Sequence, residues 1–392
     1  MPRFAFSALA AIFLVHDMAK APTIIDILVL GDHPAAYLAA ALLAHKSKLR
    51  IGHAQIPGQH HADRFVLVHS DFFSLHPLLE PLRRKMKLKQ LYGAQFIADD
   101  GTHSEYRCKS ALSGVGSLKE VRTATEKVAA GEGVEFLRPK EVRVLRVDDK
   151  GVQVSFGNQI VHPTALVLAD ALPSDQARIL GLPEEWERGV VRKYSWIRLK
   201  PGKNLELSSR PMMPMSLNLA GLLGWAWLMP GEREIQLCVE QAPETVAEYP
   251  PSSLLRRWAD LLARQGVFRS AVNIDPAHVQ TIDMPAAGAL AHEGVANRTL
   301  LVGPAGGFYA ATSEDVYPNC WSTIFAADVI KKSLKQPHLQ DALQTYRHIW
   351  RTTLGNYLRG PQQNLRFLLP LIYRNPIMTQ RMVEGVLVGR AS

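Results

Sequence analysis

The segment that most constrains the fold lies near the start of the chain, at residues 24–43. Residues 24–30 are β-branched or aliphatic apart from Asp26, and residues 34–43 are mostly Ala and Leu, with Gly31 between the two runs. Such an apolar run is typical of a strand buried on both faces, which occurs in parallel sheets covered by helices. The segment therefore predicts an α/β fold that opens with a strand, a tight turn and a helix.

This strand–turn–helix frame is typical of a dinucleotide-binding site. In the pattern GxGxxG, glycines let the backbone approach a pyrophosphate at the helix N-terminus. Here Gly31 occupies the first position, His33 the second, and Ala36 the third, where alanine is an accepted replacement. The imidazole of His33 either donates a hydrogen bond to a phosphate or blocks its space. We expect obstruction, because other positions also depart from the binding pattern.

The next strand and loop carry several histidines. A strand is expected at residues 49–53, and His53 stands near the position where an acidic residue normally binds the ribose hydroxyls. His60 and His61 lie in a polar loop, where we expect them to be exposed to solvent rather than to bind a ligand. Residues 75–92 place leucines at helical spacing opposite a basic cluster, which predicts a long helix.

Composition narrows the class of protein. The chain has 392 residues, 47% of them hydrophobic, enough for two domains or one large composite. The net charge of +9 is scattered over the chain and no nucleic-acid-binding module is recognised, so we expect no nucleic-acid partner. Cys108, Cys238 and Cys320 are far apart, which predicts reduced thiols, no metal site and a cytoplasmic location.

The first 23 residues are open to two interpretations. Arg3 precedes an apolar stretch at residues 4–15, as in a signal peptide, but no clean cleavage site follows. The stretch is also too short for a comfortable transmembrane helix. The segment is therefore either an extension, with Met18 as an alternative start, or a signal-like segment that leaves export open.

Two later segments fit the same architecture as the first turn. Residues 167–182 resemble the pattern GADGxxSxxRxxLG, matching at Asp170, Ser174, Arg178 and Gly181. Residues 300–308 and the helix from Ser322 resemble GDAAG…SGxxAA, matching at Gly303, Ala305, Gly306 and Ser322. Together the three segments resemble FAD-dependent oxidoreductases of the para-hydroxybenzoate-hydroxylase-like group, which includes geranylgeranyl reductases, monooxygenases and flavin-dependent halogenases.

The resemblance implies a Rossmann-like FAD/NAD(P)-binding domain that holds FAD non-covalently, with NAD(P)H as the reductant. The residues carried over as cofactor-binding are Gly31, His33, Ala36, Asp170, Gly303, Ala305 and Gly306. Pro304 replaces the aspartate of the third motif and offers neither a carboxylate nor a backbone N–H. We therefore expect weaker binding than in intact relatives. The alternative is a non-enzymatic descendant of this fold, a scaffold or binding protein that binds flavin weakly or not at all.

A fourth segment, residues 224–231, resembles tryptophan-containing elements of the geranylgeranyl reductases and halogenases. Trp225 and Trp227 are two residues apart, so on a strand they lie on one face. They either form one wall of an apolar substrate cavity or pack the core of a sheet. Halogenase activity is a second alternative only, because Leu91 stands where that group has its lysine, and Lys89 is two residues away.

These observations divide the chain into four parts. We expect an N-terminal extension or signal-like segment at residues 1–23, a discontinuous FAD-binding domain at 24–190 and 290–340, a mostly β substrate domain at 191–289, and a helical tail at 341–392. The tail resembles the closing helices of geranylgeranyl reductases, and it either covers an apolar tunnel, packs the core or rests on a membrane surface. The predicted function is an FAD-dependent reductase or monooxygenase of an apolar, isoprenoid or aromatic small molecule. The sequence indicates no catalytic acid or base and no oligomeric state.

Overall fold

The computed structural model describes most of the chain after the first 23 residues. The described residues are 24–58, 61–148, 151–172, 174–182, 191–200, 202, 205, 210–221, 224–285, 294–309, 316–358 and 365–388. They form an α/β molecule with two large sheets and a helical C-terminal region, the fold class that the sequence predicts.

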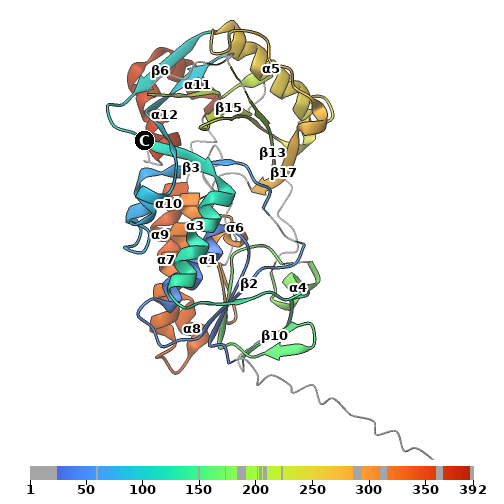
Figure 1. Ribbon diagram of the computed structural model, residues 1–392, viewed down its shortest axis with the longest axis vertical. Helices are drawn as coiled ribbons and strands as arrows, with labels where there is room; N and C mark the ends of the chain where they lie inside the picture. The colour runs from blue at the N-terminus through green and yellow to red at the C-terminus, as the bar shows by residue number, and fades with distance from the viewer. Residues whose placement is uncertain are drawn as a thin grey trace, which may run out of the picture.

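A six-stranded sheet forms the centre of the lower half of the molecule in Figure 1. Its strands, in spatial order, are β18 (Val295–Ala296), β19 (Thr299–Leu301), β12 (Ala165–Leu168), β1 (Ile27–Leu30), β2 (Ile51–Ala54) and β8 (Glu135–Leu137). All are parallel except β18. Every residue of β1, β2 and β12 is buried, so the apolar run of the sequence does form a strand covered on both faces.

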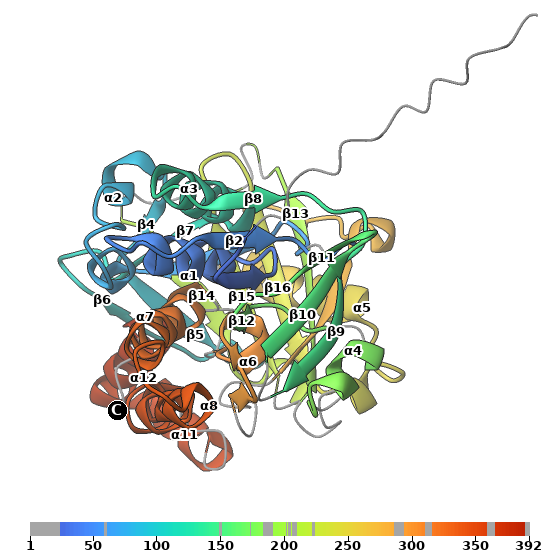
Figure 2. The same ribbon diagram turned by 90° about the horizontal axis from the view of Figure 1, so that it is seen from below.

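Different elements cover the two faces of this sheet. One face packs against α1 (Pro34–Ala44), α3 (Leu118–Gly131) and α7 (Val316–Ser333). The other packs against the small antiparallel sheet of β9 (Arg143–Asp148), β10 (Gly151–Phe156) and β11 (Gln159–Val161), and against α4 (Ser174–Ile179). Figure 2 shows the two sets on opposite sides of β1 and β2. Because β1 pairs in parallel with both β2 and β12, the carboxyl ends of these three strands lie together at one edge of the sheet.

The upper half contains a seven-stranded sheet. Its order is β17 (Gln280–Pro285), β13 (Val191–Leu199), β16 (Ile235–Gln241), β15 (Trp225–Pro230), β14 (Met213–Ser216), β5 (Gly93–Ile97) and β6 (His103–Arg107). Helix α5 (Pro251–Arg264) covers one face, and α11 (Leu365–Arg374) and α12 (Pro376–Val388) pack on β5 and β6 at the other (Figure 1). The β5–β6 hairpin comes from the segment expected in the first domain, so strand pairing crosses the expected boundary.

Residues 75–92, which precede the β5–β6 hairpin, differ from the prediction. The long helix expected at residues 75–92 is wrong, because only α2 (Leu82–Lys85) forms there and β4 (Lys89–Leu91) follows. Pro77 and Pro81 lack the N–H that a continuous helix needs. Strand β4 pairs with β7 (Ser113–Ser117), which also pairs with β3 (Phe65–His69).

The remaining α-helices come from the last quarter of the chain. They are α6 (Gly303–Gly306), α8 (Leu339–Leu343), α9 (Thr345–Thr352) and α10 (Leu354–Leu358). Within the described residues, no helix combines the length and the apolar character needed to cross a membrane.

Candidate functional site

The three motif segments meet at the N-terminus of α1. Gly31 has a φ of 143°, and a Cβ there would lie only 3.0 Å from the Cβ of Ala169. Gly303 has a φ of 56°, and a Cβ there would lie 2.9 Å from the Cβ of Ala35. Glycine is thus required at both positions, by conformation and by close approach. The motifs predict that these three segments lie close together. In the structure they do, because each follows one of the neighbouring strands β1, β12 and β19.

His33 caps the first turn of α1. Its Nδ1 accepts a hydrogen bond from the backbone N–H of Ala35 at 3.1 Å, and its carbonyl accepts one from Ala36 at 2.8 Å. The imidazole is fully buried. A helix offers the unpaired N–H groups of its first turn to an anion. Here two of those groups, the N–H of Ala35 and of Ala36, donate to His33 itself.

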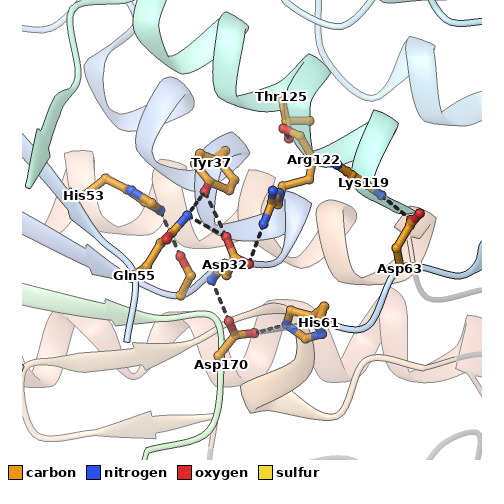
Figure 3. A network of polar contacts seen from close by, with 11 residues as sticks. Asp32, Tyr37, His53, Gln55, His61, Asp63, Lys119, Arg122, Thr125 and Asp170 are labelled. Atoms are coloured by element: carbon orange, nitrogen blue, oxygen red, sulfur yellow. Dashed lines mark hydrogen bonds and ion pairs between the residues drawn. The ribbon is translucent and has the colours of Figure 1, made fainter. Parts of the chain in front are cut away.

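Asp32, the residue between Gly31 and His33, is the centre of the polar network in Figure 3. Its carboxylate is fully buried and accepts hydrogen bonds from three side chains. The donors are the Tyr37 hydroxyl at 3.0 Å, Gln55 Nε2 at 2.7 Å and Arg122 Nη1 at 2.6 Å. Burial opposes the charge of Arg122, but the Asp32 carboxylate raises the pKa of Arg122 overall. The first turn therefore already contains an anion and its counterion.

A second carboxylate lies beside the first. Asp170 Oδ2 accepts the backbone N–H of Asp32 at 2.6 Å, and Oδ1 lies 2.8 Å from Nε2 of His61 (Figure 3). Burial disfavours its charge, yet His61 and the Asp32 amide lower the pKa of Asp170 overall. The expectation that His61 is simply exposed is wrong, because its loop returns over the turn and pairs it with Asp170. His60 lies outside the described residues.

His53 is bonded to the backbone of the first turn. Its Nε2 donates to the carbonyl of Gly31 at 3.0 Å, and its ring lies on that of Tyr37 with 4.4 Å between centroids. Burial lowers the pKa of His53 to about 4, so the ring is neutral at neutral pH. Sequence reasoning missed Asp32, Tyr37, Gln55 and Arg122. The one sequence feature that pointed to them is Asp32 itself, an acidic residue inside the glycine pattern where a phosphate is expected to bind.

Two cavities lie on either side of this network. One, of about 390 Å³, is lined by His61, Asp170, Met284, Pro304 and Tyr309 among others. The other, of about 410 Å³, opens at the ends of β2 and β8 and includes Tyr37, His53, Gln55 and Phe136. Gly58 borders both cavities. Asp32 contacts Asp170 through its amide and Gln55 through its carboxylate, so it lies between the two.

The described residues do not fit the pyrophosphate of a flavin dinucleotide at this turn. Two buried carboxylates occupy the region, and the N–H groups of Asp32 and Ala35 donate to Asp170 and His33. In the third motif, the N–H of Ala305 donates to the carbonyl of Ala169 at 2.9 Å. At Gly306 a Cβ would meet the Phe308 ring at 2.2 Å, so glycine there makes room for that ring. The N–H groups of Asp32, Ala35 and Ala305 therefore already donate within the chain.

Trp225 and Trp227 lie on one face of β15, as their spacing predicts. Trp227 is fully buried and its ring stacks on Tyr194, with 5.5 Å between centroids. Trp225 is half-buried and pairs across the strands with Glu240. Burial raises the pKa of Glu240 to about 7. Among the described residues, no group of three or more His, Cys, Asp or Glu side chains is arranged to hold a metal ion.

Comparison with known proteins finds similarity in structure only. No family model and no curated protein sequence matches the chain. A geranylgeranyl bacteriochlorophyll reductase-like protein from Thermoplasma acidophilum superposes with a TM-score of 0.66 and 16% identity, over 93% of this chain and 95% of that one. The flavin-dependent brominase Bmp2 has the same TM-score and identity, over 94% of each chain. PqsL, a probable FAD-dependent monooxygenase from Pseudomonas aeruginosa, has a TM-score of 0.66 at 17% identity, over 87% and 96%.

These similarities extend along nearly the whole of each chain. They confirm the resemblance that the three motifs indicate, at the level of the fold. The chain has the fold of the flavoenzyme group that includes geranylgeranyl reductases, monooxygenases and flavin-dependent halogenases.

Proposed function

We propose that this protein binds a small molecule on the flavin-dependent oxidoreductase fold without holding FAD through its pyrophosphate. The observation that carries the proposal is the position of Asp32, fully buried at the N-terminus of α1 and bonded to Arg122. Of the functions expected from the sequence, this geometry favours the flavin-free or weakly flavin-binding descendant over the FAD-dependent oxidoreductase.

The electrostatics of the turn support this choice. A helix N-terminus stabilises a nearby negative charge, and in this fold a bound phosphate would supply it. Here Asp32 and Asp170 supply it; Arg122 forms an ion pair with Asp32, and Nε2 of His61 lies 2.8 Å from Asp170. A pyrophosphate would bring further negative charge against two buried carboxylates, and Arg122 is already paired with one of them. Burying an uncompensated charge is costly, so FAD binding should be weak.

One observation favours an FAD-dependent reductase or monooxygenase as the second candidate. Trp225, Tyr194 and Glu240 lie together on one face of the seven-stranded sheet. An aromatic surface suits an apolar substrate, and a carboxyl group with a pKa near 7 suits proton transfer. In that case FAD would supply the redox chemistry, with NAD(P)H as the reductant. Halogenase activity has less support, because Leu91 is fully buried on β4.

The test is the absorbance spectrum of the purified protein, followed by titration of FAD and riboflavin with flavin fluorescence as the readout. We expect no bound flavin after purification and weak binding of FAD. Riboflavin lacks the pyrophosphate, so tighter binding of riboflavin than of FAD would locate the defect at the α1 turn. A yellow protein with stoichiometric FAD would overturn the proposal and establish the second candidate.

A further inference from the structure

A cluster of titratable side chains lies where α1 and α3 end. His45 follows the last residue of α1, and its Nδ1 donates at 2.9 Å to Oε2 of Glu132, which follows the last residue of α3. Lys331 of α7 donates to the carbonyl of His45 at 2.9 Å. His76, in the turn after the 3-10 helix η1 (Ser70–Ser74), lies edge-on to the His45 ring, with 5.4 Å between centroids. None of these side chains lines either cavity beside Asp32 and Asp170.

His76 holds its own turn through an unprotonated ring nitrogen. Its Nδ1 accepts the backbone N–H of Leu78 at 3.3 Å, and its carbonyl accepts that of Leu79 at 2.9 Å. A ring nitrogen that accepts a hydrogen bond carries no proton, so His76 is neutral in this arrangement. Leu79 is fully buried, and Leu75 and Leu78 pack on the same core as α1, α3 and α7. The neutral ring therefore fixes the turn that places these leucines.

The surroundings of the His76 ring oppose its protonation. Burial, the His45 ring and the Lys331 ammonium lower the pKa of His76. Asp328 and Glu132 act in the opposite direction and by less. These four charged or titratable groups come from α1, α7 and the end of α3, the helices around the turn. Protonation at Nδ1 would also remove the hydrogen-bond acceptor of the turn, so the closed turn binds a proton more weakly than an open one.

Two other histidines make the same local contact but are shielded from water. Nδ1 of His33 accepts the N–H of Ala35 at 3.1 Å, and Nδ1 of His69 accepts the N–H of Asp71 at 2.9 Å. Both rings are fully buried, whereas His76 is half-buried. Of these three rings, that of His76 can therefore take up a proton from solvent without unfolding of the core.

We propose that His76 is a proton-sensitive latch, and that its protonation releases the turn at residues 75–79 from the ends of α1, α3 and α7. The turn belongs to the stretch of chain that leads from β2 of the six-stranded sheet, through β3, α2 and β4, to β5 of the seven-stranded sheet. Its release loosens this link while both sheets stay folded. The latch involves no ligand, so it is independent of the proposed function.

The test is hydrogen–deuterium exchange of the full chain, with mass spectrometry of peptides that contain residues 77–80. Expressing exchange as a protection factor removes the intrinsic pH dependence of the amides. Protection of Leu78 and Leu79 should fall roughly fivefold between about pH 7.5 and about pH 5.5, because the open turn binds a proton near pH 6.5 and the closed turn does not. Peptides from β1 and β12 should keep their protection.

His76→Asn is the matched variant. The Oδ1 of asparagine can accept the N–H two residues further on, as Nδ1 of the histidine does, but it does not titrate. Protection of the two leucine amides should therefore change less than about twofold over the same pH range in this variant. His348→Asn replaces an exposed histidine of α9, and it should behave like the wild type.

A second variant tests the charges around the ring. Glu132→Gln keeps an acceptor for His45 but removes a negative charge that favours protonated His76 in the closed turn. The loss of protection at low pH should therefore be larger than in the wild type. Circular dichroism verifies that each variant is folded.

Three outcomes would overturn the latch. The first is unchanged protection of the turn in the wild type, and the second is equal pH dependence in the wild type and His76→Asn. The third is loss of protection in β1 and β12 together with the turn, which would indicate acid unfolding of the whole domain. If His76→Asn does not fold, Glu132→Gln decides, because an equal or smaller loss than in the wild type would contradict the latch. None of these outcomes bears on flavin binding.

Discussion

At the first turn of α1, the carboxylate of Asp32 determines where the surrounding donors point. Tyr37 comes from α1, Gln55 follows β2 and Arg122 comes from α3, yet all three donate to Asp32. A buried carboxylate is stable only when it is paired and hydrogen-bonded, and these three donors meet that requirement. The same requirement makes the turn a poor acceptor for another anion.

His33 offers a direct test of obstruction at this turn. His33→Gly removes the buried ring and its hydrogen bond from Ala35, and glycine at an N-cap costs only a few tenths of a kcal/mol. We expect this variant to bind FAD more tightly than the wild type, and an Asp32→Gly/His33→Gly double variant to bind it more tightly still. Titration with flavin fluorescence measures both. Weaker binding by His33→Gly would instead identify His33 as a phosphate ligand.

His53 should make the stability of the fold depend on pH. Its pKa is lowered from 6.5 to about 4 by burial, so between these values the unfolded chain binds a proton that the folded chain does not. The free energy of unfolding should therefore fall by about 3 kcal/mol from this residue as the pH drops from 6.5 to 4. The contribution is fully present above pH 6.5. Urea unfolding across this range measures it.

The matched variant is His53→Gln, whose side-chain amide can still donate to the carbonyl of Gly31. Its unfolding free energy should be less steep between pH 6.5 and 4. Identical pH dependence in the two proteins would show that His53 is not the group responsible.

On the scale of elements, β15 distinguishes core packing from a substrate wall. Trp227 is fully buried between Tyr194 and the methionines of the same sheet, so Trp227→Ala should lower the stability by about 3–5 kcal/mol. Trp225 is half-buried, so Trp225→Ala should cost about 1 kcal/mol. Thermal and urea denaturation measure the difference. Equal losses would contradict the different burial of the two rings.

The same pair of variants separates their roles in binding. If Trp225 forms a wall of an apolar cavity, Trp225→Ala should weaken binding of an apolar ligand more than it lowers stability. A stable Trp225→Ala protein with unchanged affinity would assign this ring to packing as well.

On the scale of the whole molecule, the helical corner between α11 and α12 is where we expect any membrane contact. Leu371 and Ile377 there are 48% and 63% exposed, and Arg374 and Arg381 beside them are exposed too. Exposed apolar side chains with arginines suit an anionic membrane surface. Co-sedimentation with vesicles of anionic lipid should therefore decrease for Ile377→Glu.

The control for this experiment is Ile160→Glu. Ile160 is 43% exposed on β11, which pairs with β10 at the opposite end of the molecule (Figure 1). This variant makes the same change of charge and should sediment like the wild type. An equal loss in both variants would indicate an effect of net charge, and no sedimentation of the wild type would contradict membrane contact at this corner.

The sequence by itself determined the local elements around the site. The apolar run before Gly31 and the small residues after it predict β1 and α1, because burial on both faces leaves no polar positions. Three ordered motifs also predicted the fold, since each marks the end of a strand in one parallel sheet. The helix predicted at residues 75–92 is wrong because Pro77 and Pro81 interrupt it and because residues 89–91 pair with β7 in a sheet.

Only the tertiary structure decided the chemistry of the turn. Asp32 is 90 positions from Arg122 and 23 from Gln55, and no local pattern predicts that these side chains meet. They meet because α3 packs against α1 and β2 lies beside β1. The glycine pattern can show that a phosphate-binding frame exists. Whether the frame is open to a phosphate depends on which distant side chains pack into it, and that is a property of packing rather than of sequence spacing.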